Sequence, residues 1–275
     1  MRAPPDRPRT AARRHGARLL CALALAGAVA APAHAGRSCR EEPLSVDEVR
    51  QSLDLAQRTF AALDASGASV AILARAGQDL SKYGLEYSHM GIVVRDHPAG
   101  RWTVVHELNA CGTASSDLYT DGVGNFFLSD LYRYRAQVLI PGPALQARVA
   151  ALLATPTGRR LHDPHYNMLA SVYSTRYQNS NQWVLETLAA ASAPPGAIET
   201  RGEAQTWLQG QGYRVPTVRV GALTRLGGRM FRANVAFDDH PFDRRMAGQI
   251  DTVTANAIVD FVRGRDPQAK LLVVE

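Results

Sequence analysis

The chain has 275 residues, 46% of them hydrophobic, and its 31 basic and 25 acidic side chains give a formal net charge of +6. Six of the basic residues and one acidic residue lie in the first 35 positions, which leaves 25 basic and 24 acidic residues in the remainder. This near-neutral remainder gives no charge-based reason to expect binding to nucleic acid or to another polyanion. It is long enough for one domain with a sizeable core.

Residues 1–35 have the pattern of a secretory signal peptide. Six arginines precede an apolar run at 19–31, which is short for a bilayer span, and Ala33-His34-Ala35 places small residues before a cleavage point. We therefore expect cleavage after Ala35 and a periplasmic or secreted protein. An uncleaved membrane anchor is the alternative. No later apolar run is long enough to cross a bilayer, so we expect no membrane span after cleavage.

Two cysteines, Cys39 and Cys111, follow the predicted leader. In an exported protein such a pair is a disulfide candidate. The bridge would close a loop of about 70 residues and would stabilise the fold by about 4 kcal/mol in the chain-entropy model. The alternative is that Cys111 is a free, reactive thiol.

Apolar spacing and turn residues predict the secondary structure in chain order. Ser45 and Glu48 form a capping box, and the apolar residues that follow at helical spacing predict a helix ending near Ser66-Gly67. A strand at 69–75 precedes two strands at 89–95 and 101–108, which should form an antiparallel hairpin connected by residues 96–100. Residues 109–125 are polar and rich in glycine, which predicts an irregular loop. The later predicted elements are strands at 133–140, 215–220, 233–237 and 271–274, and helices at 144–153, 181–191, 203–211 and 254–262.

This order of elements is not a regular alternation of strand and helix. It predicts an α+β fold with a central antiparallel sheet and helices packed on it. We expect one domain from residue 36 to residue 275, with a core at about 69–192 and a C-terminal extension at about 196–275.

Three polar residues have the side-chain types of a nucleophilic hydrolase site. His89 begins an apolar strand, Glu107 lies on the next strand, and Ser180 precedes a predicted helix whose free N–H groups can stabilise an oxyanion. Because side chains alternate along a strand, Glu107 and His106 point to opposite faces, and only one of them can face a given site. The structural alternative is that Ser180 simply caps the helix.

The polar neighbours of this set are the candidates for substrate contacts: Tyr87, Asn179, Asn181 and Gln182. Two further clusters, His162-Asp163-Pro164-His165 and Asp238-Asp239-His240-Pro241, contain proline and are more typical of turns than of metal sites. We therefore expect neither a metal ion nor a cofactor.

Four segments carry a resemblance to a known family: residues 75–84, 87–93, 105–109 and 177–186. They resemble an uncharacterised family of exported bacterial proteins, the domain-of-unknown-function family 2145. The resemblance covers nearly all of the chain after the leader. It implies no activity.

A more distant resemblance implies chemistry. A Ser-His-x-Gly-Ile-Val strand, a following strand with a carboxylate, and a nucleophile that opens a late helix are similar to the circularly permuted NlpC-like, papain-like hydrolases. This resemblance implies a permuted papain-like fold in which His89 is the base, Glu107 orients it and Ser180 is the nucleophile. The family nucleophile is a cysteine, however, and a serine hydroxyl depends wholly on its base for activation.

These observations lead to two main hypotheses. In the first, the protein is an exported hydrolase of amide or ester bonds that acts on a cell-envelope peptide or an acylated substrate through Ser180, His89 and Glu107. In the second, it is a catalytically inactive binding module that keeps the cleft. A third hypothesis places Cys111 as the reactive group beside His89.

Overall fold

The structure is a computed structural model that describes residues 43–129 and 131–275. The predicted leader and Cys39 lie outside these residues. Cleavage after Ala35 and the bridge between Cys39 and Cys111 therefore stay predictions.

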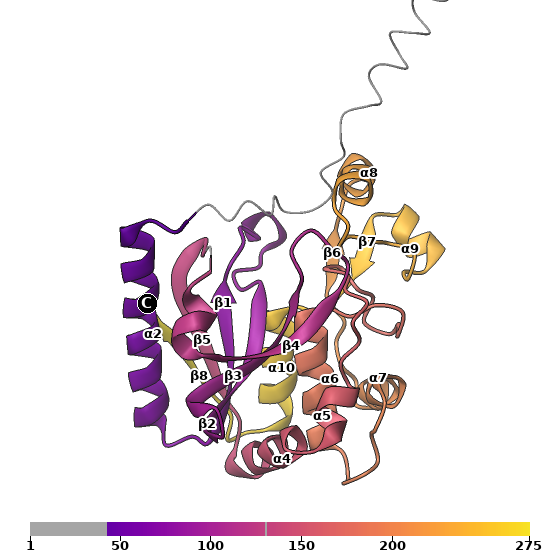
Figure 1. Cartoon of the computed structure of the whole chain (residues 1–275). Helices are drawn as coiled ribbons and strands as arrows, with labels where there is room; N and C mark the ends of the chain where they lie inside the picture. Colours follow the sequence, from indigo (N-terminus) through magenta and orange to yellow (C-terminus); the bar gives the residue numbers. More distant parts are fainter. Residues whose placement is uncertain (1–42, 130) are drawn as a thin grey trace, which may run out of the picture. The chain divides into compact units, whose positions relative to one another are not determined.

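A six-stranded sheet forms the centre of the described chain, with its strands in the order β4-β3-β2-β1-β5-β8 (Figure 1). These strands are β1 (Val70–Ala76), β2 (His89–His97), β3 (Gly100–Asn109), β4 (Ser116–Gly122), β5 (Arg133–Ile140) and β8 (Lys270–Val274). Every neighbouring pair is antiparallel. The predicted α+β fold with an antiparallel sheet is confirmed. Because β8 pairs with β5, the end of the segment that we expected to be an extension belongs to the central sheet.

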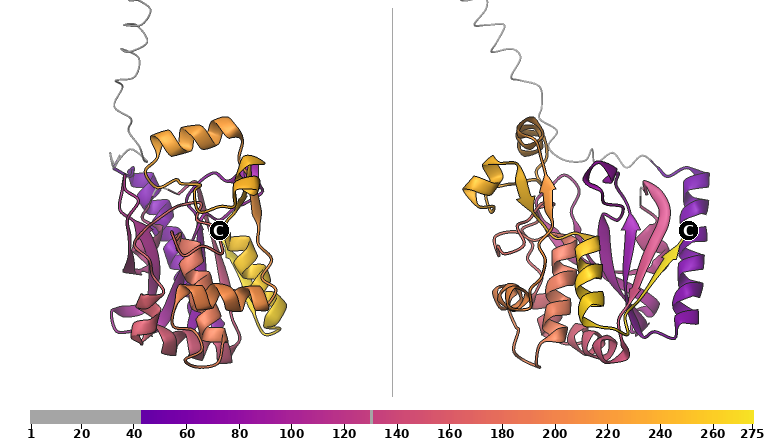
Figure 2. Two further views of the ribbon diagram at one scale, coloured as in Figure 1. Left: turned by 90° about the vertical axis from the view of Figure 1, so that its right-hand side faces the viewer. Right: turned by 180° about the vertical axis from the view of Figure 1, so that it is seen from behind.

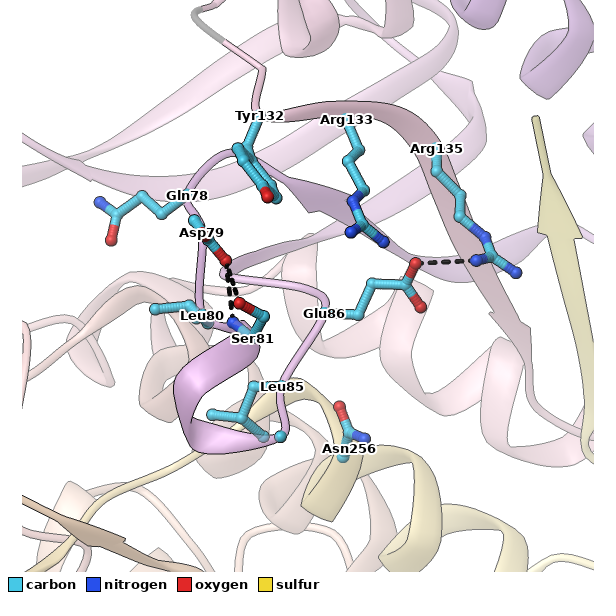
Figure 3. Close-up of a pocket in the computed structure, with 11 residues that line it drawn as sticks. Gln78, Asp79, Leu80, Ser81, Leu85, Glu86, Tyr132, Arg133, Arg135 and Asn256 are labelled. Atoms are coloured by element: carbon cyan, nitrogen blue, oxygen red, sulfur yellow. Dashed lines mark hydrogen bonds and ion pairs between the residues drawn. The ribbon is translucent and has the colours of Figure 1, made fainter.

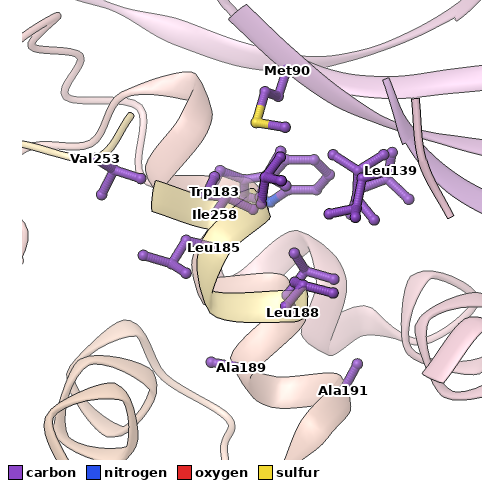
Figure 4. Close-up of a cluster of buried hydrophobic side chains, with 14 of the residues drawn as sticks. Met90, Leu139, Trp183, Leu185, Leu188, Ala189, Ala191, Val253 and Ile258 are labelled. Carbon is purple, nitrogen blue, oxygen red and sulfur yellow. The ribbon is translucent and has the colours of Figure 1, made fainter. Parts of the chain in front are cut away.

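Helices cover both faces of this sheet, as Figures 1 and 2 show. The helices on one face are α2 (Val46–Ser66) and α3 (Val123–Phe127), and those on the other include α4 (Pro143–Leu153), α6 (Ser180–Ser192), α7 (Arg201–Gly210) and α10 (Ala255–Arg265). Trp102 and Val104 of β3 pack with α2 and α3 in the first core. Met90 and Leu139 pack with Trp183 of α6 and Ile258 of α10 in the second (Figure 4).

A smaller, two-stranded sheet lies beside the loop that precedes His89. It contains β6 (Thr217–Arg219) and β7 (Gln249–Asp251), and α8 (Ala222–Phe231) and α9 (Phe242–Met246) lie between its strands in the sequence. Its buried Val218 and Ile250 belong to a third apolar cluster, which also contacts Tyr83 and Leu85. The remaining elements are the short α5 (Pro156–Arg160) and the 3-10 turn η1 (Ser81–Tyr83).

Most of the predicted helices and strands are present. The capping box at Ser45 and Glu48 is confirmed, and Gly67 ends α2 with a φ of 69°, in the left-handed region that favours glycine. The C-terminal strand and the helices that the sequence places near 144, 203 and 254 are found within one or two residues of their expected starts.

Three local predictions are wrong. Residues 109–125 are not irregular throughout, because they contain β4 and the beginning of α3. Residues 233–237 form no strand; their apolar side chains Val235 and Phe237 pack into the third cluster instead. The hairpin connection is shorter than expected, because β2 continues to His97 and β3 already begins at Gly100.

The helices can also be compared with the dimensions of a bilayer. Among residues 43–129 and 131–275, no helix is both long enough and apolar enough to cross one.

Candidate active site

The first strand of the hairpin and the helix α6 bring His89 and Ser180 together. β2 begins at His89, and α6 begins at Ser180 because Asn179 occupies the N-cap, where its side chain accepts a hydrogen bond from the N–H of Gln182. Nδ1 of His89 lies 2.9 Å from Oγ of Ser180. The two residues that sequence analysis paired as base and nucleophile are therefore within hydrogen-bond distance.

The other ring nitrogen of His89 contacts a second histidine. Nε2 of His89 lies 2.9 Å from Nδ1 of His106, and Nε2 of His106 lies 3.0 Å from Oδ2 of Asp121 on β4. The orienting position behind His89 is thus filled by His106, and the expectation that Glu107 fills it is wrong. Strand alternation is the physical reason, because Glu107 points to the opposite face of β3.

A glycine allows the two histidines to approach. A Cβ atom on Gly91 would lie only 2.6 Å from Cγ1 of Val104 and 2.9 Å from Cβ of His106. Real side chains do not tolerate such separations, so residue 91 must lack a side chain if β3 is to keep this distance from β2.

One arrangement of protons satisfies all three hydrogen bonds that connect Ser180, His89, His106 and Asp121. As an ionised carboxylate, Asp121 can only accept, so His106 donates from Nε2 and accepts at Nδ1. His89 then donates from Nε2 to His106 and accepts the hydroxyl proton of Ser180 at Nδ1. Each histidine is neutral in this arrangement, and the serine hydroxyl points at a lone pair that can take its proton.

The surroundings of the two histidines favour their neutral forms. Burial lowers the pKa of His89 well below its usual value, and the charges of Arg75 and His106 lower it further. Burial also lowers the pKa of His106 to about 4, although its hydrogen bond to Asp121 acts in the opposite direction. The ring of Phe126, 5.7 Å from that of His89, forms one wall of this apolar environment.

The beginning of α6 also offers hydrogen-bond donors. The N–H of Gln182 bonds to Asn179, but the N–H groups of Ser180 and Asn181 have no acceptor among the described residues. Unpaired N–H groups at a helix N-terminus, together with the helix dipole, stabilise negative charge. The same turn that carries the serine can therefore hold an oxyanion.

Glu107 lies on the other face of β3, near a tyrosine. It is fully buried, and this burial raises the pKa of its carboxyl to about 8, against the lowering effects of the Ser116 hydroxyl and the charge of Arg201. Burial and the carboxyl of Glu107 raise the pKa of Tyr166, while a hydrogen bond with Ser180 lowers it. Glu107 thus influences the neighbourhood of Ser180 without contacting His89.

The residues expected to contact substrate have internal roles. Tyr87 is buried in the second core, and burial raises the pKa of its phenol to about 12. Nδ2 of Asn179 donates to Thr252, and Nε2 of Gln182 donates to the carbonyl oxygens of Ser171 and Val172. Asn181 donates to the carbonyl oxygen of Ser88, 3.4 Å away. These contacts join α6 to its surroundings.

Two pockets of the described chain lie apart from His89 and Ser180. One, of about 390 Å³, is lined by the loop from Gln78 to Glu86 and by the beginning of β5, where Arg135 pairs with Glu86 (Figure 3). The other, of about 420 Å³, is lined by Tyr173, Asp239 and their neighbours. No group of three or more metal-binding side chains occurs in the part of the chain that the structure describes.

The family of the chain follows from its match to a family model. The model described as "Uncharacterized protein conserved in bacteria (DUF2145)" matches residues 62–262. The chain belongs to this family. Comparison with curated proteins and with solved structures found no match.

The part of the chain that matches the DUF2145 model contains every member of the hydrogen-bonded set. His89, His106, Asp121 and Ser180 all lie between residues 62 and 262. Sequence reasoning named His106 only as an alternative and missed Asp121. In the register of the sheet, Asp121 lies opposite Val104 and Tyr119 lies opposite His106, so Asp121 is a diagonal neighbour of His106.

Proposed function

We propose that this protein is a hydrolase of amide or ester bonds in which Ser180 is the nucleophile and His89 is the base. The observation that carries the proposal is the 2.9 Å contact between Nδ1 of His89 and Oγ of Ser180, with the other nitrogen of His89 held by His106. A nucleophile, a base and a group that orients the base are the parts shared by hydrolases of this type.

The geometry supports a two-step acyl transfer. Oγ of Ser180 attacks the carbonyl carbon while its proton moves to Nδ1 of His89, and the free N–H groups of Ser180 and Asn181 hold the resulting oxyanion. The tetrahedral intermediate then collapses, and His89 returns the proton to the leaving nitrogen or oxygen. Water, activated by His89, cleaves the acyl-serine in the second step. Throughout, His106 accepts a hydrogen bond from His89, and Asp121 accepts one from His106. These two contacts fix the orientation of His89.

We further infer that the fold is related to that of circularly permuted papain-like hydrolases. Support comes from the order of the parts: a histidine that opens one strand, a second polar residue on the antiparallel neighbour, and a nucleophile at the first position of a later helix. With cleavage after Ala35, the substrate would be a peptide or an acylated molecule of the cell envelope.

Accessibility favours the second candidate, a binding module without catalysis. Ser180 is 5% exposed and His89 is 9% exposed, so a substrate carbonyl has little open surface to approach. The lowered pKa of His89 also makes it a weaker base for a serine hydroxyl. The third hypothesis has less support, because both ring nitrogens of His89 are occupied by Ser180 and His106 and not by Cys111.

A serine-directed fluorophosphonate probe distinguishes these candidates. For the hydrolase we expect labelling of the mature protein that is lost in Ser180→Ala and in His89→Ala. It should be retained in Ser192→Ala, which changes the serine at the other end of α6. Cleavage of aryl esters and peptide anilides should follow the same pattern. Labelling that persists in Ser180→Ala, or no labelling and no turnover in the unmodified protein, would contradict hydrolysis.

The thiol variant provides a second test. In a binding module, Ser180→Cys is expected to create weak hydrolase activity, because a thiol beside an imidazole ionises far more readily than a hydroxyl. In a working serine hydrolase, the same change replaces a nucleophile that already functions. A gain of activity in Ser180→Cys over an inactive parent would therefore favour the binding module.

A further inference from the structure

Two short helices next to the small sheet expose large apolar side chains. On α8, Leu223 is 85% exposed and Leu226 is 56% exposed; on α9, Phe242 is 69% exposed and Met246 is 59% exposed. Spacings of three and four residues place each pair on one face of its helix. We refer to these four side chains as the α8–α9 surface. Exposed apolar residues that occur singly need no explanation, but two such pairs, on helices that both connect the strands of the small sheet, make this region a candidate binding surface.

Positive charge accompanies this surface. Residues 217–251, which contain the small sheet, α8 and α9, have six arginines and four aspartates, a net charge of +2, although the chain after the predicted leader is nearly neutral. Arg219 and Arg232 are exposed, and neither lies within ion-pair distance of a carboxylate among the residues that the structure describes. On α9, the guanidinium of Arg245 lies 5.5 Å from the centre of the Phe242 ring. Apolar and cationic groups therefore occur together here.

The α8–α9 surface lies near the same end of the central sheet as the proposed active site. The third apolar cluster packs Val218 and Ile250 of the small sheet against Tyr83 and Leu85, in the loop that leads to His89. Figures 1 and 2 show α8 beyond the upper ends of the central strands and α9 beside β7, on the side of the small sheet away from the central sheet. A partner held on this surface would thus lie near the end of β2 that carries His89.

We propose that the α8–α9 surface binds the anionic face of a phospholipid bilayer. Leucine, phenylalanine and methionine side chains enter the boundary between headgroups and acyl chains, while arginines stay at the level of the phosphates. Each arginine near an anionic membrane strengthens binding about fivefold. A second copy of the chain is a poor occupant, because self-association through this surface would bring like-charged arginines together. The proposal does not depend on hydrolysis by Ser180.

Vesicle sedimentation tests the proposal with the full chain after leader removal. We expect the protein to sediment with phosphatidylglycerol vesicles, to bind phosphatidylcholine vesicles at least tenfold more weakly, and to lose most binding at 0.5 M salt. The double variant Leu223→Glu/Leu226→Glu should reduce the bound fraction at least tenfold. The variant Arg219→Gln/Arg232→Gln should weaken binding about 25-fold, for anionic vesicles only.

Matched substitutions elsewhere are the controls. Val46→Glu changes an apolar residue that is 86% exposed on α2, and Arg263→Gln removes an exposed arginine of α10; neither should alter vesicle binding. Circular dichroism melting should show that the α8 variants remain folded. The proposal is overturned if the protein does not sediment with anionic vesicles, or if the α8 variants and the controls bind equally. It is also overturned if Leu223→Glu/Leu226→Glu converts a dimer to a monomer without changing vesicle binding, which would indicate a second copy.

Discussion

Nδ1 of His106 lies 2.9 Å from Nε2 of His89, on the side of the ring opposite to Ser180. A neutral histidine here serves as the acceptor in a position that a carboxylate occupies in the Ser-His-Asp triad. The negative charge is one residue further away, on Asp121, which holds His106 in the tautomer that can accept. His89 is thereby oriented through a buried neutral ring, and the charged group stays at the partly exposed edge of the sheet.

Replacing His106 by a residue that cannot accept the hydrogen bond of His89 should slow the reaction of Ser180. His106→Phe leaves the buried Nε2–H of His89 without a partner, so we expect the rate of fluorophosphonate labelling to fall roughly 100-fold and the free energy of unfolding to fall by ~1–3 kcal/mol. His106→Asn restores a carbonyl acceptor and should recover part of the rate. Equal labelling rates in the Phe variant and the unmodified protein would show that His106 has no orienting role.

Asp121 should affect His89 only through its hydrogen bond with His106. In Asp121→Asn the amide nitrogen can donate to His106, which allows the other tautomer and removes the acceptor that His89 needs. We expect the labelling rate to fall about tenfold or more, with ¹⁵N chemical shifts of the two histidine rings showing the change of tautomer. Asp117→Asn, an exposed position on the same strand, is the control and should leave both measurements unchanged.

The part of the site that sequence analysis missed lies on an edge strand. β4 has the sequence SDLYTDG and is mostly exposed, so it shows no alternation of apolar and polar residues that would reveal a strand. Pairing with β3 alone defines it, and such long-range pairing cannot be read from local composition. With β4 missed, Asp121 remained one of several acidic residues in a polar segment.

His89 and Ser180 were predictable for the opposite reason. Each begins an element with a strong local pattern, an apolar strand in one case and a capped helix in the other. Alternation along β3 also separated His106 from Glu107 correctly. The choice between them depended on the face of the sheet to which His89 points. His89 and His106 both lie on the face that carries α3, where the Phe126 ring is 5.7 Å from His89 and 5.3 Å from His106, and that placement follows from long-range packing. A carboxylate was the more familiar partner for a histidine, but it points the other way.

Gly91 of β2 should be required for the close approach of β3. A methyl group at Gly91 would collide with Val104 and with His106, so Gly91→Ala should force β2 and β3 apart. We expect it to lower the free energy of unfolding by ~1–3 kcal/mol and to reduce labelling of Ser180. Gly202→Ala is the control, because a Cβ there meets no atom within 4 Å and the residue is helical. That variant should be neutral or stabilised by ~0.4–1 kcal/mol. Equal urea midpoints for the two variants would contradict the steric argument.

Glu107 should make the protein less stable as the pH rises. Its carboxyl has a pKa of about 8 in the folded chain, mainly through burial, against a usual value of 4.5. Between these two values the folded protein retains a proton that the unfolded chain has lost, so the free energy of unfolding falls as pH increases, by at most ~1.4 kcal/mol per pH unit. The loss is complete above pH 8. The lowered pKa values of His89 and His106 have the opposite effect, since they reduce stability as the pH falls below about 6.5.

A comparison with Glu107→Gln isolates the carboxyl, because the histidines titrate in both proteins and glutamine does not titrate. Glutamine resembles the protonated acid in shape and polarity, so we expect the two proteins to be similarly stable near pH 5. As the pH rises to 8.5, the unmodified protein should become less stable than the variant by on the order of a few kcal/mol. Urea unfolding at pH 5, 6.5 and 8.5 measures this difference. A difference that does not change with pH would mean that Glu107 is ionised in the folded protein, and that its burial is compensated by Ser116 and Arg201.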